Sequence, residues 1–240
     1  IFQTPDNWKS LEAQYQNPKA PKKLGGGGRI YQKKCYDVFH NEKKTILISP
    51  TGSGKTLVQI FNAAREIIES NYEQKQIFIT PQTNIGENFT KEETLIINGQ
   101  QYHWIVNDNK FCDNQQNVIQ RLKQFLLKKS EYKHQKENNY LEGCNAVACY
   151  SALITAFNQL SHKQKLHVVQ TTSFRIDEVH HISGVDEGGV SANQLGAFCK
   201  FILDNNGSLH LSTATFYRGD NRIILSDEYL KTFKRYTVHF

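Results

Sequence analysis

The chain has 240 residues, of which 38% are hydrophobic and 22% are charged, a balance typical of a soluble globular protein. This composition excludes a collagen-like chain, a disulfide scaffold and a wholly disordered chain. The longest apolar-leaning stretch, 145–157, is too short and interrupted for a membrane-spanning helix, which needs roughly 20 apolar residues. The first residues also lack the basic-then-apolar order of a secretory signal, so we expect no membrane partner.

The formal net charge of +6 is compatible with a polyanionic partner but does not demonstrate one. Lysine outnumbers arginine, and asparagine and glutamine are frequent, a bias that coding composition alone can produce. The five cysteines are scattered, with no pair at zinc-ligand spacing, so we expect structural thiols in an intracellular, reducing compartment. Because the chain contains no methionine, we expect it to be one piece of a longer protein.

The first 28 residues are polar and carry three prolines and a run of four glycines, a composition typical of an arm with a flexible joint. An apolar face then predicts a helix over 30–39. Short apolar runs alternate with helical patterns in the rest of the chain. We expect strands at 45–49, 76–80, 95–97, 102–106, 146–149, 173–176 and 209–211, and helices at 55–70, 151–159 and 191–203. This alternation predicts an α/β fold, a parallel β-sheet with helices on both faces.

Residues 107–139 interrupt this alternation, because they are dense in asparagine, glutamine and lysine. The apolar positions Leu122, Phe125 and Leu126 predict an amphipathic helix within them. The segment is interpreted as a polar insertion, a surface helix with a mobile flank. A groove that contacts nucleic-acid phosphates is the alternative interpretation.

The strongest local pattern is the octapeptide SPTGSGKT at 49–56, between an expected strand and an expected helix. Its glycines let backbone N–H groups surround phosphate oxygens, and the helix N-terminus adds partial positive charge. Lys55 can then reach the β- and γ-phosphates, and the hydroxyl of Thr56 can bind Mg²⁺. The remaining loop residues predicted to bind the nucleotide are Thr51, Gly52, Ser53 and Gly54. Ser49 stands where the general pattern has glycine, and a small residue suffices where the turn begins.

An acidic pair, Asp177 and Glu178, follows the strand expected at 173–176. An aspartate in this place can hold Mg²⁺ through water, and the next carboxylate can orient and deprotonate the water that attacks the γ-phosphate. With Lys55, these two residues are the predicted catalytic residues, and ATP and Mg²⁺ are the predicted cofactors. His180 and His181 come next, but no third ligand is spaced to complete a metal site with them.

Three segments resemble motifs I, II and III of superfamily 2 helicases of the DExH kind: SPTGSGKT at 49–56, DEVHH at 177–181 and STAT at 212–215. Further segments resemble the branch that contains type I and type III restriction-enzyme motors and excision-repair helicases. They are RIYQ at 29–32, IFITP at 77–81 with Gln82, ACYSAL at 148–153 and TATFYRGD at 213–220. All of them fall in the family's order. Cys149 and Phe216 replace a threonine and a proline of the family pattern, and both departures concern the nucleic-acid face.

The resemblance implies an N-terminal RecA-like ATPase domain over 29–225, followed at 226–240 by the start of a linker toward a second motor domain. It also implies that Gln32 contacts adenine, with Arg29 nearby. The implied coupling residues are His180, Ser212, Thr213 and Thr215. The implied contacts to one nucleic-acid strand are Pro81, Gln82, Cys149 and Ser151.

The leading hypothesis is an ATP-dependent DNA helicase or translocase, with an RNA helicase of the same superfamily as the alternative. A nucleotide-gated interaction module without processive turnover is the alternative from another class. A second RecA-like domain or another subunit is an expected partner, because family members use an arginine finger from that domain. We expect the 240-residue chain alone to bind ATP, to hydrolyse it slowly and not to unwind nucleic acid.

Overall fold

The computed structural model describes residues 2–3, 30–81, 86–112, 117–128, 139–179, 194–214 and 225–238. Four residues assigned from the family resemblance lie outside the described residues: Arg29, Gln82, His180 and Thr215.

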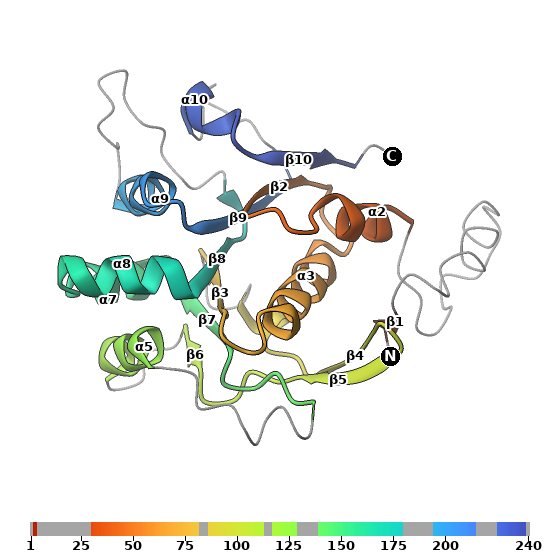
Figure 1. Cartoon of the computed structure of the whole chain (residues 1–240), viewed down its shortest axis with the longest axis horizontal. Coiled ribbons are helices and arrows are strands. Elements are labelled where there is room, and N and C mark those ends of the chain that lie inside the picture. The colour runs from red at the N-terminus through yellow and green to blue at the C-terminus, as the bar shows by residue number, and fades with distance from the viewer. Residues whose placement is uncertain are drawn as a thin grey trace.

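A seven-stranded β-sheet, parallel throughout, forms the centre of the molecule (Figure 1). Its spatial order is β10 (Lys234–Thr237), β2 (Lys44–Ile48), β9 (Ser208–Thr213), β8 (Thr172–Ile176), β3 (Lys75–Thr80), β7 (Asn145–Cys149) and β6 (Lys110–Phe111). Parallel neighbours need crossover connections, and helices supply most of them here. The predicted α/β fold, a RecA-like sheet with helices on both faces, is confirmed.

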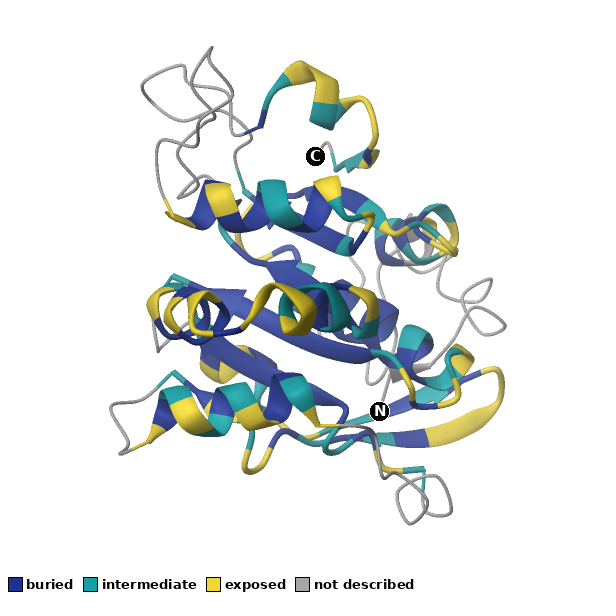
Figure 2. Cartoon of the chain, turned by 60° about the vertical axis from the view of Figure 1, so that its left-hand side comes forward, coloured by how far each residue is buried: buried dark blue, intermediate teal, exposed yellow. Residues whose placement is uncertain are grey.

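Helices cover the two faces of the sheet unequally (Figure 1). On one face lie α5 (Val118–Leu127), α7 (Tyr150–Asn158), α8 (His162–Thr171) and α9 (Gln194–Asp204). On the other lie α2 (Ile30–Val38) and α3 (Lys55–Glu69). Because strand side chains alternate, Ile77 and Ile79 of β3 enter the first core and Phe78 enters the second. Figure 2 shows the strands buried between these two helical layers.

A separate three-stranded sheet lies beside the main one. It pairs β4 (Glu93–Ile97) antiparallel with β5 (Gln100–Trp104), and β1 (Phe2–Gln3) lies parallel to β4. The hairpin turns at Asn98 and Gly99, both at positive φ (51° and 78°), which suits the twist of a two-residue turn. The fully buried Trp104 anchors it, donating its indole N–H to the carbonyl of Phe89 at 3.0 Å. Thus the strands expected at 95–97 and 102–106 form, but outside the parallel sheet.

The described part of 107–139 differs from the expected insertion, because it belongs to the sheet and to its cover. β6 pairs with β7, and α5 buries Leu122, Phe125 and Leu126 in the larger core. The buried ammonium of Lys75 in β3 stabilises the C-terminal end of α5 by donating hydrogen bonds to the backbone carbonyls of three residues. These acceptors are Phe125 at 3.1 Å, Lys128 at 3.2 Å and Leu126. Within the described part, Gln120 and Gln124 lie on the exposed face of α5.

The described part of 226–240 also differs from the expected linker. The short helix α10 (Asp227–Leu230) leads into β10, which pairs in parallel with β2 and forms an edge of the main sheet.

Helix α8 was not predicted from the sequence, although a capping box marks its start. The hydroxyl of Ser161 accepts from the backbone of Gln164 at 3.3 Å, and the Gln164 side chain accepts from the Ser161 backbone at 2.9 Å.

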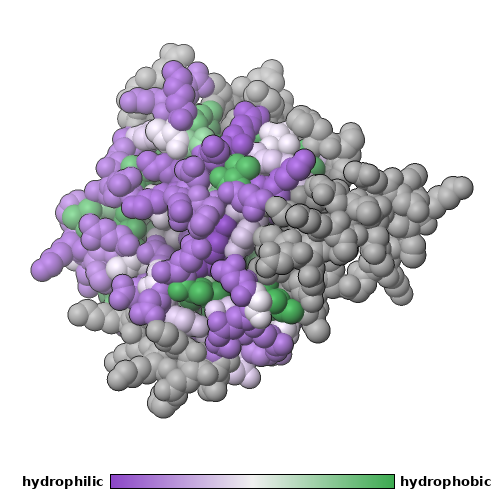
Figure 3. Space-filling model, turned by 45° about the vertical axis from the view of Figure 1, so that its right-hand side comes forward, coloured by the Kyte–Doolittle hydropathy of each residue, from purple (hydrophilic) through white to green (hydrophobic). Residues whose placement is uncertain are grey.

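The outer surface is mainly polar. Figure 3 shows a largely hydrophilic face on which the hydrophobic patches are small and separate. Among the described residues, Tyr140 is a large hydrophobic side chain with substantial exposure, 38%. In the part of the chain that the structure describes, no helix is both long enough and apolar enough to pass through a bilayer.

Buried charges join α3 to the middle of the sheet. Glu66 of α3 accepts from Arg175 of β8 at 2.5 Å, from Ser173 at 2.8 Å and from Gln76 at 3.1 Å. His210 of β9 lies with its Nε2 3.3 Å from Glu66, and its Nδ1 lies 2.9 Å from the hydroxyl of Thr45. Each side chain in this cluster thereby has a polar neighbour inside the protein, which a buried charge requires.

The cluster shifts the pKa values of two of its members. Burial would raise the pKa of Glu66, but Arg175 and His210 outweigh it, so the net pKa lies well below its ordinary value. Burial and the charge of Arg175 lower the pKa of His210 below its ordinary 6.5. The lowered pKa favours the neutral form of His210 at pH 7, with its Nδ1 within hydrogen-bond distance of the Thr45 hydroxyl and its Nε2 near the Glu66 carboxylate.

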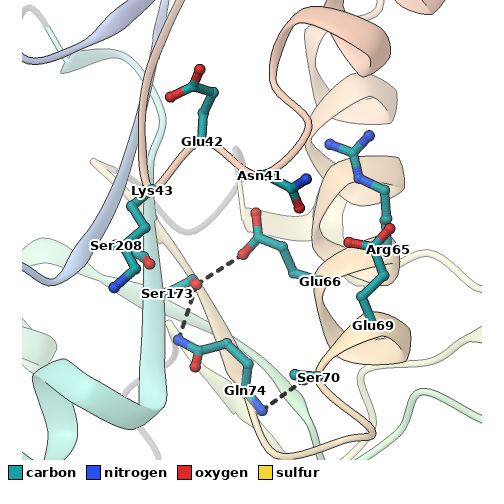
Figure 4. A pocket seen from close by; sticks show the side chains of 10 residues that line it. All are labelled: Asn41, Glu42, Lys43, Arg65, Glu66, Glu69, Ser70, Gln74, Ser173 and Ser208. Carbon is teal, nitrogen blue, oxygen red and sulfur yellow. Dashed lines mark hydrogen bonds between the residues drawn. The ribbon is translucent and has the colours of Figure 1, made fainter.

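A pocket of about 190 Å³ opens beside this cluster, at the amino ends of the strands (Figure 4). Glu66 and Ser173 lie on its wall, joined by their hydrogen bond, and Arg65 and Glu69 of α3 complete the helical side. The pocket therefore lies at the opposite edge of the sheet from the loop at 49–54.

We expect the free energy of unfolding to fall as the pH drops below about 6.5. The unfolded chain takes up a proton at His210 near its ordinary pKa of 6.5, whereas the folded chain, with a lowered pKa, does not. Stability is therefore lost as the pH falls, with a slope of up to about 1.4 kcal/mol per pH unit. Denaturant unfolding between about pH 7.5 and pH 5 measures this slope, which His210→Gln should reduce. The matched control is the exposed His162→Gln, and an equal slope in both variants would contradict the assignment.

Candidate active site

The candidate site lies at the carboxyl edge of the main sheet. Because all seven strands are parallel, the segments that follow β2, β8 and β9 emerge at this same edge. They are the loop 49–54, the acidic pair Asp177 and Glu178, and the end of β9 with Ser212 and Thr213. The structure thus brings together motif segments that are more than 100 residues apart in the chain.

The loop after β2 has the curvature that a phosphate cradle needs. Gly52 and Gly54 have φ values of 73° and 99°, a backbone region that side chains strongly disfavour. The hydroxyl of Ser49 donates to that of Ser53 at 2.6 Å and closes the loop from inside. Pro50 and Thr51 are exposed at its tip.

Helix α2 supports the loop from outside. The hydroxyl of Tyr31 donates to the carbonyl of Ser53 at 2.6 Å, and the Gln32 amide donates to the carbonyl of Gly54 at 3.2 Å. A Cβ at Gly54 would lie 2.6 Å from the Gln32 amide nitrogen, so a larger residue there would displace the Gln32 side chain from its present position. The structure therefore places Gln32, which is only 7% exposed, against the loop. No local pattern in the sequence indicated this role of Tyr31.

Lys55 stands between the loop and the acidic pair. Its ammonium donates to the carbonyl of Ser49 at 3.1 Å and lies 3.9 Å from a carboxylate oxygen of Glu178. The two charged side chains are mostly buried, 10% and 21% exposed, so water screens their attraction only in part. Thr56 follows Lys55 in the first turn of α3 and is half-buried.

Asp177 is buried and held by two donors. Its Oδ1 accepts from the hydroxyl of Ser212 and, at 3.4 Å, from the amide of Gln59, which also donates to Ser212 at 2.7 Å. Burial raises the pKa of Asp177 above its ordinary value, although the Ser212 hydrogen bond and the charge of Lys55 oppose this shift. A cation beside Asp177 would favour its ionised form.

The strand order explains why Ser212 reaches Asp177. β9 lies between β2 and β8, with Thr213 opposite Ile48 and Leu211 opposite Ile176. Ser212 therefore sits between the loop and the acidic pair. The backbone N–H of Ser49 also donates to the carbonyl of Thr213 at 3.0 Å.

Gln59 is a site residue that the sequence analysis missed. It lies one helical turn after Lys55 on the face of α3 that meets the sheet, and it is 5% exposed. A polar residue at this spacing, on the buried face of an amphipathic helix, is the signal that could have found it.

The residues expected to contact nucleic acid occupy the same edge. Pro81 directly follows β3, and Cys149 ends β7, where it pairs in register with Thr80. Ser151 is exposed in the first turn of α7, with its hydroxyl 3.4 Å from the Cys149 sulfur. The structure thus groups Pro81, Cys149 and Ser151 beside the loop and the acidic pair.

The donor set fits Mg²⁺ together with phosphates. Mg²⁺ prefers oxygen ligands and is usually held by one or two carboxylates and the substrate's phosphates. Asp177 and the Thr56 hydroxyl are oxygen donors at this edge, and the buried carboxylate gains from a cation. Among the described residues, no three histidine, cysteine or acidic side chains gather into a metal site of their own.

Three solved structures resemble this chain. The type ISP restriction-modification enzyme LlaGI, in complex with a DNA substrate mimic, is 15% identical over 91% of this chain and 20% of its own, with a TM-score of 0.53. The UvsW helicase from bacteriophage T4 is 13% identical over 98% of this chain and 70% of its own, with a TM-score of 0.46. The DUF1998 helicase MrfA, bound to DNA and AMPPNP, is 15% identical over 88% of this chain and 27% of its own, with a TM-score of 0.49.

At this level of identity the similarity to LlaGI supports the fold alone. The chain spans about a fifth of the length of LlaGI, just over a quarter of that of MrfA and 70% of that of UvsW. The comparison with curated proteins gives no match.

A family model described as "Type III restriction enzyme, res subunit" matches residues 10–218, which is most of the chain. This match confirms the resemblance to superfamily 2 helicases stated from the motifs. The chain belongs to the family of type III restriction enzyme res subunits and is an ATP-binding domain of the helicase kind.

Proposed function

We propose that this chain is the ATP-hydrolysing first motor domain of a DNA helicase or translocase of the DExH kind. One observation carries the proposal: a glycine-rich loop, Lys55, Asp177 and Glu178 share one edge of the sheet. Lys55 contacts both Ser49 of the loop and Glu178, and Ser212 donates to Asp177. The loop and the N-terminus of α3 suit a triphosphate, and Lys55 suits its terminal charges.

Each side chain of the site has a distinct part in the proposed reaction. The ammonium of Lys55 exchanges its contact with Ser49 for the β- and γ-phosphate oxygens. Glu178 orients a water molecule in line with the γ-phosphate and accepts its proton. Thr56 and Asp177 would hold Mg²⁺, which neutralises charge on the phosphates when bound. Ser212 and Gln59 fix the carboxylate of Asp177.

DNA is the favoured nucleic-acid substrate. Restriction enzymes act on DNA, and the structurally similar LlaGI is described in complex with a DNA substrate mimic. Pro81, Cys149 and Ser151, with Gln82, would contact one strand through its backbone. The first N–H groups of α7 carry no side-chain cap and are suited to a phosphate. A second RecA-like domain, in the same protein or another subunit, would supply the arginine that accelerates hydrolysis.

Lys55→Ala should weaken binding of an ATP analogue at least about tenfold, because it removes the cation that faces the phosphates. Glu178→Gln should keep binding but lose turnover, because the amide cannot accept the proton from water. Titration with a fluorescent analogue and phosphate release measure the two effects. Lys200→Ala, an ion-paired lysine on α9, is the control and should change neither. A wild type that binds the analogue without turnover, with binding unchanged in Glu178→Gln, would instead favour a nucleotide-gated interaction module.

Ser212→Ala should weaken ATP-analogue binding about tenfold in Mg²⁺, because a hydrogen bond to a carboxylate contributes about 1.5–3 kcal/mol. The loss should grow as the pH is lowered from 8, because burial raises the pKa of Asp177 and the Ser212 hydrogen bond opposes that rise. Titrations in Mg²⁺ and in EDTA over a series of falling pH values test this expectation. Equal losses in Mg²⁺ and EDTA would show that Asp177 is not a metal ligand.

The 240-residue chain by itself should bind ATP and hydrolyse it slowly. An arginine supplied to the transition state raises the rate by roughly 10³–10⁵-fold in related phosphoryl transfers, and the proposed donor is a second domain. Steady-state phosphate release with and without oligonucleotide measures the rate. Rapid, oligonucleotide-stimulated turnover by this chain would contradict the need for a second domain.

A further inference from the structure

Tyr150 connects the start of α7 to the backbone of the acidic pair. Its hydroxyl donates to the carbonyl of Asp177 at 2.5 Å and lies 3.3 Å from the carbonyl of Glu178. Burial, and the nearby charges of Asp177 and Glu178, raise the pKa of Tyr150 above its ordinary value. The hydroxyl therefore stays protonated and remains a donor at every pH at which the protein is folded and active.

The acidic pair needs such a contact because its backbone is held in an unusual conformation. Glu178 has a φ of 52°, in the left-handed region that non-glycine residues seldom occupy, so surrounding contacts must stabilise it. On one side, the backbone N–H of Asp177 donates to the carbonyl of Ile79 at 2.9 Å. On the other side, Tyr150 holds the two carbonyls. Together these contacts hold the stretch of main chain from which both carboxylates extend.

Tyr150 is also rigidly joined to the surface that would contact nucleic acid. It is the first residue of α7, between Cys149, which precedes the helix, and the exposed Ser151. A displacement of this helix start would move the Tyr150 ring with it. A change of even a few tenths of an ångström would lengthen the hydrogen bond to Asp177, whose strength depends steeply on geometry.

We propose that Tyr150 is a positioning residue that couples nucleic-acid contact at the start of α7 to the geometry of Asp177 and Glu178. The inference rests on the proposed function, since it needs both ligands. It differs from the role of Ser212, which holds the carboxylate of Asp177, because Tyr150 acts on the main chain. Nucleic-acid contact at Cys149 and Ser151 then affects nucleotide binding through the Tyr150 hydroxyl. By the same route, nucleotide binding affects the nucleic-acid contact.

The test removes this hydroxyl with Tyr150→Phe and keeps the ring. The affinity for an ATP analogue with Mg²⁺ is measured with and without a 15-nucleotide oligo(dT). The affinity for the oligonucleotide is measured with and without the analogue. In the wild type we expect each ligand to change the affinity for the other by the same factor, about fivefold or more. In Tyr150→Phe this factor should fall toward one, an effect that a purely structural role would not produce.

Tyr229→Phe is the matched control, because it removes a hydroxyl of α10 that donates to Asp204 at the end of α9, away from the site. It should keep the wild-type factor. A factor of one in the wild type, or equal factors in the wild type and Tyr150→Phe, overturns the coupling role while leaving ATP binding intact. Failure of the wild type to bind the analogue at all contradicts the proposed function itself.

A measurement on the unaltered chain covers the case in which Tyr150→Phe does not fold. Oligo(dT) alone, without nucleotide, should change hydrogen exchange at the backbone amides of 177–179, although these residues do not contact the oligonucleotide. Unchanged exchange at 177–179, with the oligonucleotide bound, overturns the inference.

Discussion

The placement of α3 on the sheet is the constraint on which the candidate site depends. The glycine-rich loop leads directly into the first residue of this helix, so the distance between Lys55 and the acidic pair follows from how α3 docks. Its docking face is polar at two points, Gln59 near the site and Glu66 two turns further on. Buried polar contacts of this kind require specific partners, and they therefore select one position of the helix where apolar packing would tolerate several.

The two polar contacts differ in their chemistry. At the amino ends of the strands, Glu66 and Arg175 form a buried ion pair that neighbouring donors complete, and breaking it would leave an uncompensated charge. At the carboxyl ends, Asp177 accepts from the neutral side chains of Gln59 and Ser212, and burial raises its pKa. The first contact is thus electrically satisfied within the protein, whereas the second gains from an added cation. That difference supports the proposed site at one end of α3 and a structural role for the ion pair at the other.

Apolar periodicity predicted the elements well where strands are buried on both sides. The strands found at 75–80 and 172–176 agree with the expected 76–80 and 173–176 within one residue. Apolar periodicity did not predict which sheet a strand belongs to, because a short apolar run does not specify the strand with which it pairs. β4 and β5 therefore form a hairpin outside the main sheet, and the weakly apolar β6 and β10 complete its edges. Edge strands are half exposed and need no continuous apolar run.

By itself, the sequence determined the parallel α/β class and the identity of the loop, Lys55, Asp177 and Glu178, because strand–loop–helix chemistry is local and carries its own spacing. Only the tertiary structure decided which polar side chains reach them. Gln59, Tyr31 and Tyr150 meet partners 22 to 153 residues away, and nothing in a local pattern specifies such a contact. The physical reason is that hydrogen-bond partners inside a core are chosen by strand order and helix docking, which are properties of the whole chain.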